Sequence, residues 1–177
     1  MFSKPHIFLI AVFAIIAAPA AARAADEVYE TPSAFIAGAF SGGSNAGTIT
    51  IAGDTAEAAK AIFDGRAYRA ARVRYYQSGE RTAWVLEEIG KTKPITVGIV
   101  VDGGKIDTVK VLVYRESIGS EVQRPAFTKQ FRNTTLKDDR RHTLSRRING
   151  ISGATLSVNA LNRLSRFALL LHDEVVN

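Results

Sequence analysis

The strongest periodic pattern of apolar and polar residues lies near the C-terminus. From about Leu156 to His172, apolar residues recur every three or four positions, which is the spacing of one helical face. Arg163 and Arg166 fall outside this apolar stripe. The pattern predicts an amphipathic helix whose apolar face covers a hydrophobic core. The members of the stripe are Leu161, Leu164, Ala168 and Leu171.

Two shorter helices are predicted nearer the N-terminus. The first covers 31–40, with Thr31 as its N-cap and Pro32 at its first helical position. The second covers 54–63, with Asp54 as its N-cap. An Asp-Gly pair follows the second helix and favours its termination there.

Strand signals replace the helical pattern further along the chain. β-branched and aromatic residues form four runs, at 70–76, 82–89, 95–101 and 106–114. Turn sequences at 77–80 and 102–105 join neighbouring runs into two antiparallel hairpins. The glycine- and serine-rich stretch 41–47 lacks the Lys-Ser/Thr ending of a P-loop, so we expect a simple connection there.

Both faces of the last run, 106–114, carry a mixture of apolar and polar residues. Since neither face is polar throughout, we expect this strand to lie inside the sheet and not at its edge. Trp84 is expected in the core of another strand. The order of elements predicts an α+β fold, in which helices pack on a twisted antiparallel sheet. One face of the last strand is predicted to carry Ile106, Thr108, Lys110, Leu112 and Tyr114, and the other Asp107, Val109, Val111 and Val113.

The N-terminus has the three parts of a secretory signal peptide. Lys4 supplies a positive charge, an apolar run covers about 7–18, and Ala22-Arg23-Ala24 matches an Ala-x-Ala cleavage site. The run is short for a membrane-spanning helix, although an uncleaved anchor is the alternative interpretation. We therefore expect residues 1–24 to be a signal peptide, residues 25–177 to form one domain, and the location to be periplasmic.

Composition and charge narrow the function classes. The chain has no cysteine, which excludes disulfides and thiolate metal sites. Its formal net charge is +6, and removal of Lys4 and Arg23 with the signal peptide would lower this to +4. An exported protein rarely meets nucleic acid, so no such partner is expected. A basic cluster is interpreted either as a docking or phosphate-facing surface or as a solvated loop. It consists of Arg140, Arg141, Arg146 and Arg147.

The segment from Asn149 to Thr155 carries the clearest candidate chemistry. It ends in Ser152-Gly153-Ala154-Thr155, directly before the predicted C-terminal helix. A glycine turn at a helix N-terminus gathers unpaired backbone N–H groups at the positive end of the helix dipole, where phosphate binds. The Thr155 hydroxyl at this place either holds or esterifies a phosphate, or caps the helix without a ligand.

This segment resembles the flavinylation motif of the FMN-binding domain family, Asp-x-x-Ser/Thr-Gly-Ala-Thr. The family includes the covalent-FMN subunits of the sodium-pumping NADH:quinone oxidoreductase and of the Rnf complex. Three further segments are similar to the family in order and spacing, at 101–106, 109–119 and 127–131, so the resemblance extends over about 68–176. It implies that FMN is the cofactor and that Thr155 is esterified to the FMN phosphate.

The chain departs from the family pattern in two places. Asn149 stands where the family has aspartate, and Ser117-Ile118 replaces Thr-Pro. The aspartate belongs to the signal that the flavin transferase recognises. Asparagine keeps its size and an acceptor oxygen but lacks its charge, so this substitution bears on covalent attachment rather than on FMN binding.

The predicted cofactor site also includes the end of the last predicted strand, where loops commonly carry function. Glu116 is interpreted either as an acceptor from the flavin ring or as an ion-pair partner of a nearby cation, and Gly119 follows it. Phe127 and Phe131 either wall the flavin ring or fill the core. Candidates for stabilising reduced flavin by positive charge are Arg115, Arg124, Lys129 and Arg132. The predicted cofactor-binding residues are Ser152, Gly153, Ala154, Thr155, Glu116 and Gly119.

Other chemistries have less support in the sequence. There is no Gly-x-Ser-x-Gly or nicotinamide fingerprint, and His142 and His172 lack a metal-ligand spacing with carboxylates. We expect a periplasmic flavoprotein that transfers electrons between redox partners. The resemblance implies two partners, an exported flavin transferase with FAD as the FMN donor and a membrane or periplasmic redox protein. The alternatives are a non-redox relative that docks to a membrane complex and an exported flavin-dependent reductase.

Overall fold

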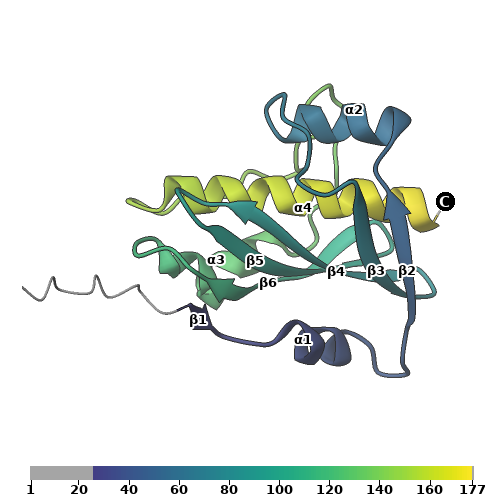
Figure 1. Ribbon diagram of the computed structural model, residues 1–177, viewed down its shortest axis with the longest axis horizontal. Coiled ribbons are helices and arrows are strands. Elements are labelled where there is room, and N and C mark those ends of the chain that lie inside the picture. Colours follow the sequence, from purple (N-terminus) through teal and green to yellow (C-terminus); the bar gives the residue numbers. More distant parts are fainter. Residues whose placement is uncertain (1–25, 177) are drawn as a thin grey trace, which may run out of the picture.

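The computed structural model describes residues 26–176, and the predicted signal peptide lies outside this range. An antiparallel sheet of six strands forms its centre, in the order β1-β6-β5-β4-β3-β2, and this confirms the predicted α+β fold (Figure 1). The strands are β1 (Glu27–Val28), β2 (Asn45–Thr50), β3 (Arg72–Ser78), β4 (Arg81–Ile89), β5 (Pro94–Asp102) and β6 (Lys105–Tyr114). The helices are α1 (Pro32–Ala39), α2 (Gly53–Ile62), α3 (Pro125–Thr128) and α4 (Thr155–Val176), with 3₁₀ turns η1 (Ser120–Gln123) and η2 (Lys129–Phe131).

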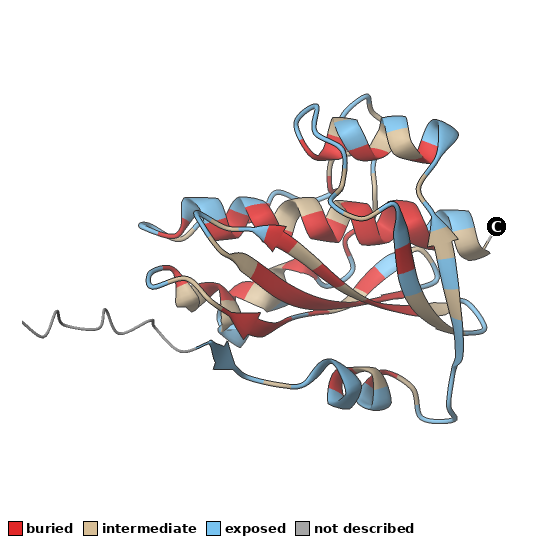
Figure 2. Ribbon diagram, in the orientation of Figure 1, coloured by how far each residue is buried: buried red, intermediate tan, exposed pale blue. Residues whose placement is uncertain are grey.

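Helices cover the two faces of the sheet unequally. α4 lies along one face and α2 packs on the outer side of α4, where the Phe63 and Phe167 rings meet edge to face with 5.2 Å between their centroids (Figure 1). On the opposite face, Phe35 of α1 lies so close to Gly98 that a Cβ there would come within 2.6 Å of its ring. The main core lies between α4 and the sheet, and a smaller core lies beneath α1. Most of α1 itself is exposed, so the sheet face that it covers is only partly shielded (Figure 2).

The predicted apolar stripe of α4 is confirmed, because all four of its residues are buried. Trp84 is also fully buried, as expected for a core residue of a strand. Phe127 and Phe131 belong to the main core and meet edge to face with 5.7 Å between their centroids. Both rings therefore contribute to core packing. Within residues 26–176, no helix combines the length and apolar character that crossing a membrane requires.

The two shorter helices begin differently. Thr31 caps α1 as predicted, since its Oγ1 accepts a hydrogen bond from Ala34 N at 3.2 Å. The predicted N-cap of α2 is wrong: Ala52 holds this position without a side-chain hydrogen bond, and Asp54 lies in the first turn. Gly53 has a φ of +54°, which a glycine adopts readily. The helix therefore begins at Gly53, one residue before Asp54. The Asp54 carboxylate still lies near the positive end of the helix dipole.

Neither edge strand is predicted from the sequence. β2 begins at Asn45, so the interpretation of the whole stretch 41–47 as a connection is wrong. Gly47 of β2 pairs with Tyr75 of β3, and a Cβ at Gly47 would come within 2.3 Å of the Tyr75 ring. The glycine that resembles a loop residue therefore makes room for an aromatic ring of the neighbouring strand.

β6 lies between β1 and β5, as expected for an interior strand, but its predicted faces are wrong. The pairing of β5 with β6 shifts between Thr96 and Val97, and again between Val100 and Val101. Each extra residue of a β-bulge interrupts the two-residue alternation of side chains. As a result, the main core receives Ile106, Val109, Val111 and Tyr114, and the core beneath α1 receives Leu112 and Val113.

A buried histidine links the last turns of α4 to the sheet. His172 Nε2 accepts a hydrogen bond from Gly104 N at 3.1 Å, so the ring proton lies on Nδ1. Nδ1 faces Thr82 Oγ1 at 2.8 Å, and the same oxygen accepts a hydrogen bond from Trp84 Nε1 at 2.9 Å. Burial lowers the pKa of His172 below its usual value, because protonation would charge a shielded ring and remove the acceptor of Gly104.

The lowered pKa of His172 predicts a loss of stability in mild acid. The unfolded chain takes up the proton near pH 6.5, whereas the folded chain resists it until a lower pH. The free energy of unfolding should thus fall as the pH drops below about 6.5, by at most about 1.4 kcal/mol per pH unit for this one group. Urea unfolding of wild type and His172→Gln between about pH 7 and pH 5 tests this, and equal pH dependence in both would contradict it.

Candidate cofactor-binding site

The predicted phosphate-binding segment forms a tight turn that leads directly into α4. Ala154 N donates to Ile151 O at 3.0 Å, and Gly153 has a φ of +81°, which favours glycine. Ala154 O accepts the first helical hydrogen bond, from Val158 N at 2.9 Å, so Ala154 holds the N-cap position. Ala154 is buried, whereas Ser152 and Thr155 on either side of it are exposed. The turn therefore presents two hydroxyl groups to solvent at the start of a long helix.

The groups at this helix start fit a phosphate. Alanine has no side-chain acceptor, so the N-cap residue cannot satisfy the first N–H groups of α4. Among residues 26–176, no side chain accepts a hydrogen bond from the N–H groups of Thr155, Leu156 or Ser157, and Thr155 Oγ1 has no hydrogen bond. A Cβ at Gly153 would meet no atom within 4 Å, so the space beside this residue of the turn is open. Thr155 is the first residue of the helix and does not act as its cap.

The loop after β6, which carries the predicted site residue Gly119, contacts this turn. Gly119 is buried with a φ of +94°, and a Cβ there would lie 3.3 Å from Ala154 Cβ and 3.1 Å from Ser157 Oγ. The Tyr114 hydroxyl joins the two segments, since it donates to Ile118 O at 2.6 Å and lies 2.9 Å from Ser157 Oγ. The end of β6 and the first turn of α4 therefore form one packed unit.

Glu116 supports a neighbouring turn instead of pointing to an open site. Its Oε1 accepts hydrogen bonds from the backbone N–H groups of Lys91 and Thr92 at 2.6 Å and of Lys93 at 2.8 Å. Its Oε2 accepts from Thr92 Oγ1 at 3.0 Å. Burial alone would raise the pKa of Glu116, but these four donors outweigh it and lower the pKa. Glu116 thus stays ionised and orders the turn between β4 and β5.

Asn149, where the family has aspartate, is held through its backbone. Asn149 N donates to Gln130 Oε1 at 2.9 Å, and Gln130 Nε2 donates to Asn149 O at 3.4 Å. The side chain of Asn149 is exposed and, among the described residues, makes no hydrogen bond. Replacement of its amide by a carboxylate would therefore leave these two contacts in place.

A groove of about 260 Å³ lies beside the turn. Its walls come from η1, α3, η2 and the residues before the turn, and Arg124 is the cation on its rim. Two large apolar side chains near the turn face solvent, Ile118 at 71% and Leu156 at 49% exposure. The lining residues are Glu121, Arg124, Ala126, Phe127, Gln130, Gly150 and Ile151.

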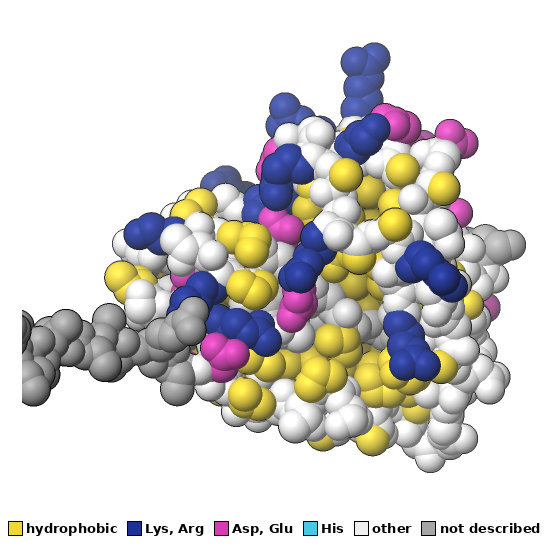
Figure 3. Space-filling view, in the orientation of Figure 1, with side chains coloured by type: hydrophobic (Ala, Val, Ile, Leu, Met, Phe, Trp, Pro, Cys, Tyr) yellow, Lys and Arg dark blue, Asp and Glu magenta, His cyan; other side chains and the backbone are white. Residues whose placement is uncertain are grey.

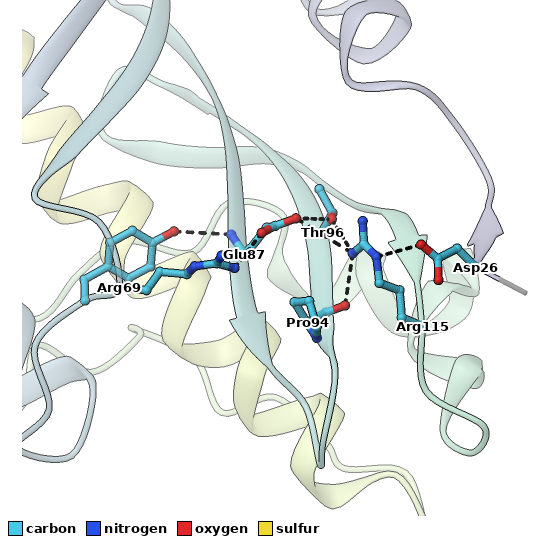
Figure 4. A network of polar contacts seen from close by, with 7 residues as sticks. Asp26, Arg69, Glu87, Pro94, Thr96 and Arg115 are labelled. Carbon is cyan, nitrogen blue, oxygen red and sulfur yellow. Dashed lines mark hydrogen bonds and ion pairs between the residues drawn. The ribbon is translucent and has the colours of Figure 1, made fainter. Parts of the chain in front are cut away.

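The other candidate cations for reduced flavin lie elsewhere. Arg115 Nη1 donates to Thr96 Oγ1 at 2.9 Å and belongs to a polar network on the sheet face that carries α1 (Figure 4). Lys129 and Arg132 line a separate groove of about 370 Å³, where Arg132 lies 3.7 Å from Asp107. Of the four predicted cations, only Arg124 lines the groove beside the turn.

The basic cluster lies on the loop that precedes the turn. Arg166 of α4 fixes this loop by donating to Arg141 O at 2.7 Å and to His142 O at 3.0 Å. Arg146 and Arg147 line a groove of about 440 Å³ together with Arg166, whereas Arg140 and Arg141 do not line it. Among the described residues, none of the four predicted arginines forms an ion pair within 4.0 Å. All four arginines are thus exposed cations, and two of them line this groove.

Gln130 and Tyr114 organise the site, although the sequence does not predict this role for either residue. Gln130 lies within the family-like stretch 127–131, but its bonds to Asn149 join residues that lie 19 positions apart, and no local sequence pattern reveals such a contact. The sequence places Tyr114 only on one face of a strand. The bulges of β6 turn its side chain toward α4, where its hydroxyl contacts Ile118 O and Ser157 Oγ.

Comparison with known families bears directly on this region. Residues 90–170 match the family model of the FMN-binding domain, whereas no curated protein and no solved structure matches the chain. The matched residues include the loop after β6, the turn before α4 and most of α4 itself. They fall within the range 68–176 over which the sequence resembles the family. FMN is the cofactor that this match supports for residues 90–170 of the chain.

Proposed function

We propose that this chain is an exported flavoprotein that carries electrons, with FMN attached through its phosphate to Thr155 Oγ1. One observation carries the proposal. Thr155 is the exposed first residue of α4, its hydroxyl is free among the described residues, and the helix start beside it has no side-chain cap. A hydroxyl and a phosphate-binding set of N–H groups at one place suit a phosphoester.

FMN, when bound, would supply the redox chemistry by accepting and releasing electrons at its ring. The chain itself would supply binding and position. The N–H groups at the start of α4 and the helix dipole would stabilise the phosphate charge. Arg124 would place a positive charge beside a ring lying in the adjacent groove, which favours the reduced, anionic form.

Covalent attachment requires a maturation partner. We infer an exported flavin transferase that uses FAD as the FMN donor, as the resemblance to the sodium-pumping oxidoreductase and Rnf subunits implies. The Thr155 oxygen would bond to the FMN phosphate while AMP leaves. The free side chain of Asn149 is then open to the transferase, and the redox partner would be a membrane or periplasmic protein.

Protein purified from a periplasmic extract tests export and FMN binding separately. N-terminal sequencing should give Ala25 as the first residue, and the folded protein should show a flavin absorbance spectrum. Full-length protein found only in the membrane fraction would contradict cleavage and favour an anchor. Colourless protein, even after incubation with FMN, would contradict the electron-carrier function and favour a non-redox docking module. Oxidation of a reduced pyridine nucleotide by the yellow protein alone would favour a reductase.

A further inference from the structure

On the sheet face that carries α1, a groove lies beside this helix, whose first residue Pro32 lines it. It has a volume of about 520 Å³ and runs across β3, β4, β5 and the end of β6. Val113 belongs to the small core beneath α1 and Val85 packs against that core partly buried, and both line the groove. Figure 3 shows apolar side chains gathered in the middle of one face of the molecule, with Lys and Arg side chains on both sides of them. An apolar surface with a polar rim is the usual composition of a binding interface.

The charge of this groove is unbalanced. Four arginines line it, Arg69, Arg72, Arg74 and Arg115, against the single acidic residue Glu87. Glu87 is already engaged, since its Oε2 accepts from Arg69 at 2.6 Å and its Oε1 accepts from Thr96 Oγ1 at 2.8 Å. Arg72 and Arg74 are exposed and form no ion pair with another described residue. Two guanidinium groups therefore remain available to carboxylates from outside.

A polar network holds one end of the groove in place. Arg115 donates to Asp26 Oδ2 at 3.0 Å, to Pro94 O at 3.1 Å and to Thr96 Oγ1, which in turn donates to Glu87 (Figure 4). A ligand would thus meet side chains that are already ordered, and a surface ordered before binding loses less conformational entropy on association.

We propose that this groove docks an extended acidic segment of a protein partner. Carboxylates of the segment pair with Arg72 and Arg74, and its apolar side chains lie on Val85 and Val113. Charge complementarity selects an acidic occupant, and the positive net charge, +6 for the full sequence and +4 without Lys4 and Arg23, disfavours a second copy of this chain. Arginine and tyrosine dominate interface hot spots, and Arg74 lies over the ring of Tyr76 with 5.9 Å between Cζ and the ring centroid. The inference does not depend on FMN.

A synthetic peptide tests this surface. The probe is an acetylated and amidated peptide in which glutamate and valine alternate, titrated into labelled protein at low ionic strength and followed by NMR. Amide shifts should change at Arg72 to Tyr76 and at Val85 to Glu87, and a lysine–valine peptide should cause none of these changes. Arg72→Gln with Arg74→Gln should weaken the binding about tenfold, with unchanged thermal unfolding because both side chains are exposed.

Three further measurements separate the proposal from simpler explanations. Arg140→Gln with Arg141→Gln removes the same charge elsewhere, so equal weakening by this control pair would mean non-specific attraction and overturn the proposal. Val85→Thr keeps the shape of the groove but makes it polar, and it should weaken peptide binding severalfold. The protein could instead sediment with phosphatidylglycerol vesicles in a way that depends on Arg72 and Arg74, while the peptide causes no shifts. This result would assign the surface to membrane binding and would also overturn the proposal.

Discussion

Thr155→Val should abolish covalent flavin while leaving the fold intact. Valine keeps the size and branching of threonine but has no hydroxyl, so no phosphoester can form at this residue. Thr155 is exposed and has no hydrogen bond among the described residues, so stability should change by no more than about 0.5 kcal/mol. The measurement is flavin fluorescence of the protein band on a denaturing gel, after production together with an exported flavin transferase.

Matched variants distinguish attachment from binding. Thr155→Ser retains a hydroxyl and should keep part of the covalent flavin, whereas Ser152→Ala should keep most of it. Asn149→Asp restores the usual acidic residue without disturbing the backbone contacts to Gln130, and it should raise the flavinylated fraction. Covalent flavin that persists in Thr155→Val would contradict the assignment of this residue. Flavin that leaves wild type on denaturation would mean a non-covalent site, with Thr155 as a phosphate ligand.

Gly119→Ala should destabilise the fold by about 3 kcal/mol and weaken FMN binding, because one methyl group is forced between two parts of the site. The new Cβ would lie 2.8 Å from the Tyr114 hydroxyl and 3.3 Å from Ala154 Cβ. Relief of these contacts must move the loop after β6 away from the start of α4. Urea unfolding and titration with FMN measure the two effects.

Gly43→Ala is the control for backbone strain. Gly43 has a φ of +85°, close to the +94° of Gly119, but a Cβ at Gly43 would meet no atom within 4 Å. The free energy of unfolding of this variant should fall by only about 1 kcal/mol, which is the usual effect of a side chain in the left-handed region of backbone conformation. The variant should bind FMN normally. Equal losses in both variants would show that the contact between Gly119 and Ala154 contributes nothing.

The sequence predicts those parts of the fold whose signals are local. The apolar stripe of α4 and the turns between β3 and β4 and between β5 and β6 each depend on a few adjacent residues, and all are confirmed. β2 could not be predicted locally. Gly47 looks like a loop residue in the sequence, and only its pairing with the distant Tyr75 shows that this glycine makes room for an aromatic ring within a strand. The bulges of β6 depend on its pairing with β5, which no alternation of side chains reveals.

The residues of the candidate site also fall into those with local sequence signals and those whose roles depend on distant contacts. Seven consecutive residues predict the turn at Gly153 and the helix start at Thr155, because a turn before a helix is encoded locally. Glu116 could not be assigned correctly without the turn between β4 and β5, whose backbone N–H groups it accepts. The contact of Gly119 with Ala154 likewise exists only because β6 ends beside the first turn of α4.

Peptide mass spectrometry of the wild-type protein, produced together with an exported flavin transferase, tests directly whether FMN is attached at Thr155. The peptide containing Thr155 should gain the mass of one FMN less one water, and fragmentation should place the added group on Thr155. An unmodified peptide, in a preparation where the transferase flavinylates a known substrate, would contradict covalent attachment.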